Sequence, residues 1–523
     1  MANKNVLVRT QMQHALIFTD NQYQEQRLGI LRSPGAHRIA THLRTNHNIQ
    51  TQVVDFFLDW TLDEIKLVID HQLTKPTLFI AFGCSLMFDG VTEFSELRDY
   101  IKKINPSVSI IVGGNKTLQK GFDQADYYIE GTGEGAISAL VEHLLDNKKP
   151  LKYQMQEGNT IIDGRTQYPV ASMHGLDIKY QKSDFIGKDE VLGLETARGC
   201  IFKCAFCDFP GIGKKKLDYL RDQKELTEEL LKNFKDHGTT KYIVTEDTVN
   251  DTDQKCEMLA DIASHLPFQL QLMGYMRADL LISKPKNLDN LMKAGWKGMH
   301  FGLETFNERA GRIIGKGMEP NKMKEGLIDI KKRYPNLNIT STFIVGLPYD
   351  TREEILESLE WIIQSKALDF WSYNPLVIPT KDPNVKHSYF TDNYLMYGYQ
   401  NLSKKQVDEE REKLDNVVKY ALAWWKNIIY WKNENFNYFT AIDFVSEISR
   451  KSYAHRKIDG WSAFAMSGLG ENLDNIFAKS YNGDNKIDTE EQIRLVNQYI
   501  TNYKRKKTDY YKTHMLIDNN GRD

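Results

Sequence analysis

Cysteine is scarce in this sequence, with five residues among 523. An odd number of cysteines in a chain of this length does not fit a disulfide framework, so we expect a reducing compartment and thiols that act as ligands or catalysts. Long apolar runs are also lacking, because the longest, LFIAFGCSLMF at 78–88, is too short to cross a bilayer. The N-terminus shows no signal-peptide pattern. These features predict a cytoplasmic protein with no membrane partner.

An excess of charge of either sign is absent as well. The chain has 68 basic and 70 acidic residues, which gives a formal net charge of −2. This balance provides no overall attraction to nucleic acid or anionic lipid, and we expect no nucleic-acid partner. Apolar residues make up 41% of the sequence and aromatic residues 11%, which is typical of packed globular structure. The length predicts two or three domains.

Residues 1–150 alternate strand-like apolar runs with helical patterns. The expected strands lie at 14–20, 51–57, 77–85, 108–114 and around 127–130, with helices expected near 62–72 and 92–104. This alternation predicts a Rossmann-like open parallel sheet. Residues 151–190 have weaker periodicity and are interpreted as a linker with a short hairpin.

A second alternating series covers residues 191–380. Its expected strands begin at VLGLETARGC (191–200) and end at ALDFWSYNPLV (367–377), with helical patterns between them. Six strand–helix units predict a partial (β/α)6 barrel, shorter than the complete eight-unit barrel. Residues 381–523 are interpreted as a mostly helical C-terminal region, a candidate cap over the substrate. The predicted fold class is therefore α/β in two sheets, followed by helices.

Three of the five cysteines stand together after the first strand of this second series. Cys200, Cys204 and Cys207 have the spacing C-x3-C-x2-C. Structural zinc sites use four protein ligands, usually as two separated pairs. An iron–sulfur cluster held by three thiolates instead leaves one iron open to a non-protein ligand. A structural zinc site and chemically inert thiols remain as alternatives.

The cysteine motif, with RGC before it and Phe206 before its last cysteine, resembles that of the radical S-adenosylmethionine (radical SAM) superfamily. The resemblance implies a 4Fe-4S cluster on the three cysteines and S-adenosylmethionine chelated to the open iron. It also implies reductive cleavage to a 5′-deoxyadenosyl radical, with a one-electron reductant such as flavodoxin or ferredoxin as partner and an acceptor substrate that the sequence does not identify. The cofactors supply the chemistry, and the protein positions and shields them.

The same resemblance assigns S-adenosylmethionine contacts at the ends of later strands. Glu246 or Asp247, in VTED, would bind the methionine amine; which of the two serves stays open. Arg277 would bind the carboxylate, and Glu304, in FGLE, the ribose hydroxyls. The segment FIVGLP would pack against adenine, through Ile344, Gly346 and Pro348.

The N-terminal segment resembles the cobalamin-binding domain found in one branch of this superfamily. The matching positions lie at expected strand ends and are Ser85, Gly113, Gly114, Gly131 and Gly133. Glycines there would let backbone approach a large flat ring closely. The Asp-x-His-x-x-Gly segment of many cobalamin proteins is missing, so cobalamin would bind without a protein imidazole.

The leading hypothesis is a cobalamin-dependent radical SAM enzyme that performs methyl transfer or a rearrangement. Two alternatives stay open: a cobalamin-independent radical SAM enzyme with a vestigial N-terminal domain, and an iron–sulfur redox or sensor protein without radical chemistry. A methylthiotransferase is disfavoured, because it would need a second cluster and Cys84 is the only cysteine before residue 200.

Overall fold

The computed structural model describes the greater part of the chain. The described residues are 12–20, 32–83, 94–114, 122, 124–146, 149–156, 158–170, 172–187, 190–202, 204, 220–316, 318–347, 349–376, 435–436, 438–453, 455 and 489–517. Two compact units can be distinguished. The first comprises residues 1–193, 228–239 and 494–523, and the second comprises 194–227 and 240–493.

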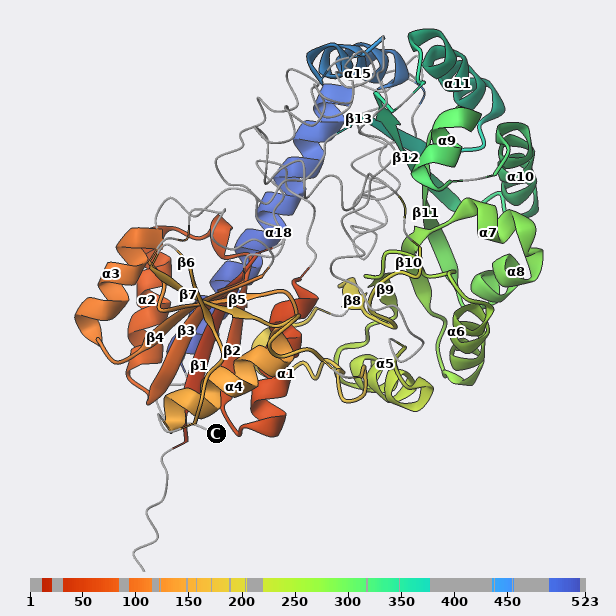
Figure 1. Ribbon diagram of the computed structural model, residues 1–523. Coiled ribbons are helices and arrows are strands. Elements are labelled where there is room, and N and C mark those ends of the chain that lie inside the picture. The colour runs from red at the N-terminus through yellow and green to blue at the C-terminus, as the bar shows by residue number, and fades with distance from the viewer. Residues whose placement is uncertain are drawn as a thin grey trace, which may run out of the picture. The chain divides into compact units, whose positions relative to one another are not determined.

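The first unit is built on a seven-stranded sheet with the order β2-β1-β3-β4-β5-β7-β6 (Figure 1). Its strands are β1 (His14–Thr19), β2 (Gln50–Asp55), β3 (Thr77–Gly83), β4 (Ser109–Gly114), β5 (Tyr127–Glu130), β6 (Gln154–Gln156) and β7 (Asn159–Asp163). All neighbours are parallel except the hairpin β6–β7. The chain order reverses between β1 and β3, which is where open α/β sheets bind ligands. The hairpin falls within residues 151–190, and β7 extends the sheet by pairing with β5.

Helices cover both faces of this first sheet. The helices α1 (Pro34–Asn46) and α4 (Gly133–Leu145) pack on one core, while α2 (Leu62–Leu73) and α3 (Phe94–Ile104) pack on the other. Local sequence explains their starts: Pro34 opens α1, and Thr61 with Glu64 forms a capping box at α2. The predicted helices at 62–72 and 92–104 thus agree with α2 and α3 to within two residues.

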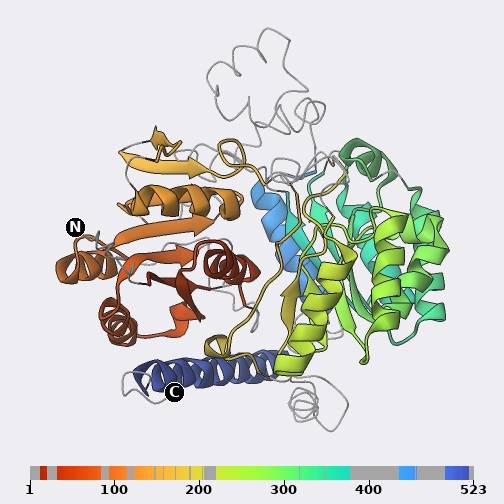
Figure 2. The same ribbon diagram turned by 90° about the horizontal axis from the view of Figure 1, so that it is seen from below.

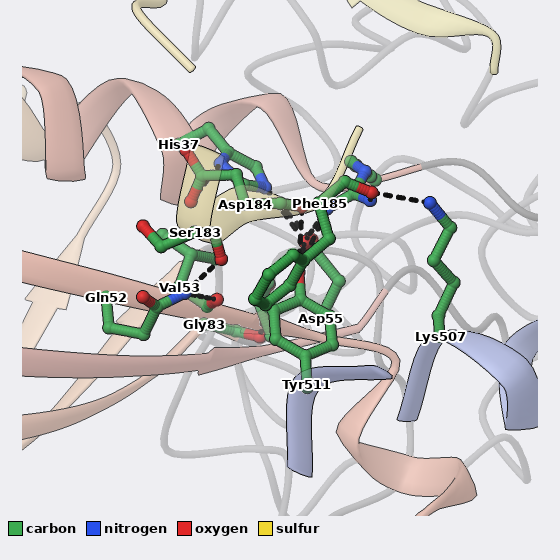
Figure 3. A network of polar contacts seen from close by, with 12 residues as sticks. His37, Gln52, Val53, Asp55, Gly83, Ser183, Asp184, Phe185, Lys507 and Tyr511 are labelled. Carbon is green, nitrogen blue, oxygen red and sulfur yellow. Dashed lines mark hydrogen bonds and ion pairs between the residues drawn. The ribbon is translucent and has the colours of Figure 1, made fainter. Parts of the chain in front are cut away.

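The last described helix, α18 (Thr489–Ile517), belongs largely to the first unit and lies alongside its sheet (Figure 2). Tyr511 joins the core under α2 and α3, and its hydroxyl reaches a buried polar network around Arg32 and Asp55 (Figure 3). Lys507 reaches Glu190 in the same network. The chain's last helix therefore completes its first unit.

The second unit carries a six-stranded parallel sheet with the order β13-β12-β11-β10-β9-β8. Its strands are β8 (Leu192–Leu194), β9 (Lys241–Val244), β10 (Gln271–Met276), β11 (Trp296–Glu304), β12 (Asn338–Val345) and β13 (Phe370–Pro375). The helices of this unit are α6 (Asp253–His265), α7 (Ala278–Ser283), α8 (Pro285–Lys293), α9 (Glu308–Ile314), α10 (Pro320–Arg333), α11 (Arg352–Ser365) and α15 (Tyr438–Tyr453). The helix α5 (Gln223–His237) connects β8 to β9, and its residues 228–237 are grouped with the first unit. Since β8 and β13 remain edges, the sheet is a partial barrel.

The predicted α/β class is confirmed: an open sheet comes first, a six-stranded partial barrel follows, and the described parts of the C-terminal region are helical. Strand ends in the barrel domain carry the polar residues that the sequence indicated. None of the helices in the described ranges combines the length and apolar composition that crossing a membrane would require.

Candidate functional site

Two of the three clustered cysteines lie in the described chain, on the loop that follows β8. The Cys200 Sγ lies 3.4 Å from the Thr248 Oγ1, and the Cys204 Sγ lies 3.5 Å from an Arg277 Nη. Residues from beyond β9 and β10 therefore contact the two thiols. Cys207 and Phe206 lie outside the described residues, and no group of three metal-ligating side chains occurs among those described. Metal ligation by the three cysteines stays a prediction.

Arg277 holds the cysteine loop against the end of β10. Its guanidinium forms a bidentate pair with Asp279, at 3.0 and 2.6 Å, and lies over the Phe202 ring at 4.1 Å. Asn250 clamps the backbone of Arg277 from both sides, since its amide donates to the carbonyl at 2.8 Å and its oxygen accepts from the N–H at 2.9 Å. A fixed positive charge thus lies beside the Cys204 thiol.

The two carboxylates in VTED have different surroundings. Glu246 is buried and bound by the Lys255 Nζ at 2.5 Å and the Thr196 amide at 2.9 Å. Lys255 also pairs with Asp251 at 3.0 Å. Glu246 therefore ties the end of β8 to α6. Asp247 is half-buried, and its charge helps to raise the pKa of the Cys200 thiol, after the larger effect of burial.

This difference predicts separable effects of removing the two charges. Asp247→Asn is expected to weaken S-adenosylmethionine binding by about ten- to a hundredfold, because a hydrogen bond to a charged group contributes roughly 1.5–3 kcal/mol. Glu246→Gln is expected to cost about 1–3 kcal/mol of stability by weakening a buried pair. Equilibrium binding to the cluster-loaded protein and denaturant unfolding measure the two effects. Equal loss of affinity in both variants would contradict the separation.

Glu304 ends β11 in an unusual backbone conformation. Its φ is +68°, in the left-handed region that a non-glycine residue seldom adopts, and the pairing with β12 shifts register there. The side chain is buried, and its Oε1 lies 3.6 Å from the Lys316 Nζ. Burial raises the pKa of Glu304, while Lys316 opposes the rise. The strained turn directs the carboxylate to the same strand end as Arg277 and the thiols.

The segment after β12 forms a turn held by a buried carboxylate. Ile344 is half-buried, and Gly346 has a φ of +98°, which favours glycine. Asp350 accepts from the Leu347 N–H at 3.0 Å and the Thr305 hydroxyl at 3.5 Å. Burial raises the pKa of Asp350 well above its usual value. Asp350 thereby joins the turns after β11 and β12. Pro348 lies outside the described residues.

The glycines assigned to cobalamin lie at the carboxyl edge of the first sheet, but their surroundings differ. Gly113 and Gly114 end β4, and no heavy atom lies within 4 Å of where a Cβ on Gly113 would stand. A Cβ on Gly131 would meet Arg165 at 2.6 Å, and one on Gly133 would meet Ile39 at 2.9 Å. Only Gly113 of these three borders open space. Ser85 lies outside the described residues.

Several supporting residues were not expected from the sequence. They are the partners of the expected side chains, namely Thr196, Thr248, Asn250, Lys255, Lys316 and Asp350. Asn250 and Lys255 follow β9 in the polar stretch TEDTVNDTDQK, where pattern alone does not distinguish a buried lysine from a solvated one. The spacing of four residues between Asp251 and Lys255 was the one available signal.

The site thus combines two thiols, a fixed arginine and a buried carboxylate at the carboxyl ends of the strands of a partial parallel barrel. Such a site is typical of a cofactor-dependent barrel enzyme. Residues 194–362, which include all of these groups, match the Radical SAM superfamily model. The chain therefore carries a radical SAM domain, and its membership of the Radical SAM superfamily rests on these residues. That membership implies a 4Fe-4S cluster and S-adenosylmethionine as its cofactors.

Solved structures with a similar fold come from cobalamin-related enzymes. The radical S-adenosylmethionine methyltransferase TsrM of Kitasatospora setae, solved with tryptophan and an S-adenosylmethionine analogue, gives a TM-score of 0.51 at 12% identity, over 69% of this chain and 72% of its own. The cobalamin-dependent radical enzyme OxsB, solved with aqua-cobalamin and S-adenosylmethionine, gives 0.50 at 14% identity, over 94% and 71%. At these identities the likeness concerns the fold.

Curated relatives with similar sequences have a different named activity. A tRNA-2-methylthio-N(6)-dimethylallyladenosine synthase of Buchnera aphidicola is 22% identical over 60% of this chain and 70% of its own length. One of Natranaerobius thermophilus is 20% identical over 52% of this chain and 58% of its own length.

Proposed function

We propose that this protein is a cobalamin-dependent radical SAM enzyme that performs methyl transfer or a rearrangement. The observation that carries the proposal is the order of two cofactor-type folds in one chain. An open parallel sheet with glycines at its carboxyl edge precedes the radical SAM domain. OxsB, whose likeness extends over 94% of this chain, is named as a cobalamin-dependent enzyme.

In the barrel domain, the described side chains would bind and orient S-adenosylmethionine. Asp247 would hold the amine and Arg277 the carboxylate, while Glu304 would accept hydrogen bonds from the ribose hydroxyls. Ile344 and the Gly346 turn would lie against adenine. A 4Fe-4S cluster held by Cys200, Cys204 and Cys207 would supply the electron for reductive cleavage of the bound S-adenosylmethionine. Asp350 and Asn250 would keep the binding groups fixed without touching the cofactor.

In the first unit, the open space beside Gly113 is what fits a large ring. Gly131 and Gly133 serve packing against Arg165 and Ile39, so they leave little room for a ligand on their own Cβ side. We therefore assign the close approach of the corrin to Gly113 and Gly114. Cobalamin would carry the methyl group or take part in electron transfer, and the glycines would exclude side chains from its place.

The vestigial-domain alternative is tested by filling that space. Purification with hydroxocobalamin is expected to give a protein that retains the cofactor, as an absorbance spectrum shows. Gly113→Phe is expected to lower cobalamin retention at least about tenfold, because the phenyl ring would occupy the position assigned to the corrin. Gly113→Ala adds only one methyl group and is expected to lower retention less. Equal retention by the wild type and Gly113→Phe, with equal unfolding midpoints, would assign cobalamin elsewhere. No retention by the wild type would favour the vestigial domain.

The activity of the curated relatives is the second candidate, since they share the radical SAM domain. Methylthio transfer would draw sulfur from a second cluster that needs its own thiolate ligands. Before the motif the sequence offers Cys84 alone, and after it Cys256 alone, which α6 buries completely. This shortage of thiols is why we favour the cobalamin-dependent reaction.

A further inference from the structure

The two faces of the barrel sheet differ in burial at Tyr275 and His300, whereas Thr340, on the same face as these two, is completely buried. Strand register places four side chains on one face in a row that we name the polar row: Tyr275, His300, Thr340 and Phe370. The next row toward the carboxyl end includes Thr342 and Ser372. Tyr275 keeps 41% of its surface exposed, and His300 is half-buried.

The opposite face is closed. Six side chains that alternate with the polar row along β11, β12 and β13 are at most 5% exposed: Met299, Phe301, Ile339, Phe343, Trp371 and Tyr373. Lys297, at the start of β11, is exposed. Helices α6 to α11 lie outside β10–β13, on that closed face (Figure 1). The polar row consequently lies on the face of the sheet that points away from these described helices.

The polar row is rigid, because His300 is held on both nitrogens. Its Nδ1 lies 2.8 Å from the Thr340 Oγ1, and its Nε2 lies 3.1 Å from the Thr342 Oγ1. Burial, with a smaller contribution from Lys316, lowers the pKa of His300 to about 4, so the imidazole is neutral at pH 7. The ring meets the Tyr275 ring edge-on, with 5.0 Å between centroids.

The polar row also lies close to the reactive strand end. Tyr275 precedes Arg277 by two residues, a rise of about 6–7 Å along a strand. The Val249 N–H donates to the Tyr275 carbonyl at 2.9 Å, which joins the row to the turn that carries Asp247. A group seated on Tyr275 would therefore lie within reach of a radical formed above the thiols.

We propose that the polar row binds the acceptor substrate through an uncharged, planar group that packs on Tyr275. His300 is a positioning residue that fixes the Tyr275 ring and does not touch the reacting atoms. This inference names the substrate class for the site in the proposed function and rests on it. Hydroxyls of Thr342 and Ser372 would add hydrogen bonds without adding charge.

The lack of charged side chains among those named on this face favours a neutral group over a nucleic-acid backbone. Proteins that bind phosphates place lysine or arginine against them. The six side chains named on this face carry no charge at neutral pH, and Lys316 beside them is engaged by Glu304 and by the Gly302 carbonyl at 2.7 Å. An RNA acceptor would have to keep its phosphates away from this surface.

Indole, which is planar and uncharged, serves as the probe. Saturation-transfer NMR on the full-length, cluster-loaded protein is expected to detect indole binding. Tyr275→Leu is expected to weaken that binding about two- to tenfold, and Tyr275→Phe to restore it, because the ring and not the hydroxyl carries the contact. Tyr153→Leu removes a tyrosine that is 52% exposed in the first unit and is the matched control, with wild-type binding.

The outcomes are distinguishable from failure of the proposed function, because indole binding needs no turnover. Equal indole binding by the wild type and Tyr275→Leu, in protein that still forms 5′-deoxyadenosine, would overturn this inference alone. Displacement of indole by inorganic phosphate would overturn the neutral-group assignment, because it would place a charged group on the polar row. Tyr275-dependent binding in a wild type that forms no 5′-deoxyadenosine would support the surface and overturn the radical function.

Discussion

Cys204→Ala is expected to abolish 5′-deoxyadenosine formation from S-adenosylmethionine under reducing, anaerobic conditions. Cys204 is one of three expected thiolate ligands, and its Sγ lies 3.5 Å from the fixed Arg277 guanidinium. Changes to groups that only orient a metal ligand typically cost about 10–100-fold. Loss of a ligand itself is therefore expected to cost more than about a hundredfold. Chromatography of the nucleoside product and the cluster absorbance measure the loss.

Cys256→Ala makes the same chemical change at a thiol outside the site. Cys256 is completely buried in α6, and burial raises its pKa to about 12, so it is a protonated packing residue at neutral pH. The variant is expected to keep its cluster and its product formation. If Cys204→Ala formed as much 5′-deoxyadenosine as Cys256→Ala, the three-cysteine assignment would be wrong. The iron–sulfur sensor alternative predicts that even the wild type forms none.

Much of the fold could be predicted because it depends on local patterns. Apolar runs such as HALIFT and NITSTFIV form β1 and β12, and their alternation with helices predicts parallel pairing. The cysteine motif and FGLE have fixed positions relative to strand ends. Parallel strands bring those ends together, so Glu304 and the thiols were expected at one edge of the sheet.

The partners of these groups could not be predicted in the same way. Whether Glu246 faces a ligand or a buried lysine depends on how α6 packs. The sequence pattern around Lys255 does not distinguish this buried lysine from a solvent-exposed lysine on a helix. The strained φ of Glu304 likewise follows from a register shift that pattern does not reveal. Such features depend on tertiary packing, which overrides local preference.

The polar network in the first unit is the clearest example of a feature that the sequence does not predict, because it joins residues far apart in the chain. Arg32 and Asp55 precede Tyr511 by more than 450 positions, and the three make mutual contacts (Figure 3). The Arg32 Nη1 lies 2.6 Å from the Asp55 carboxylate, and the Arg32 Nε contacts Glu190. All four side chains are buried. No sequence pattern indicates that the C-terminal segment 494–523 belongs with the first sheet.

Arg32→Met is expected to destabilise the first unit by about 3–5 kcal/mol. Methionine approximates the aliphatic stem of arginine but removes the guanidinium, so Asp55 and Glu190 stay buried without their main cation. An uncompensated buried charge lowers the free energy of unfolding by about this amount. Hydrogen exchange of the β1 and β2 amides measures the free energy of opening in this unit separately from the barrel. The matched control is Arg98→Met, whose partner Asp99 has a side chain that is 71% exposed, so the pair is expected to contribute less than about 1 kcal/mol.

The pH dependence of the stability of the first unit provides an independent check on the same prediction. Arg32 helps to hold the pKa values of Asp55 and Glu190 below their usual range, although burial opposes this. A carboxyl with a depressed folded pKa contributes stability above its unfolded pKa and loses it as the pH falls. The difference between the wild type and Arg32→Met should therefore be full at neutral pH and narrow below about pH 4. A difference that is independent of pH would point to lost packing of the arginine stem, and equal protection in Arg32→Met and Arg98→Met would show that the network does not stabilise the first unit.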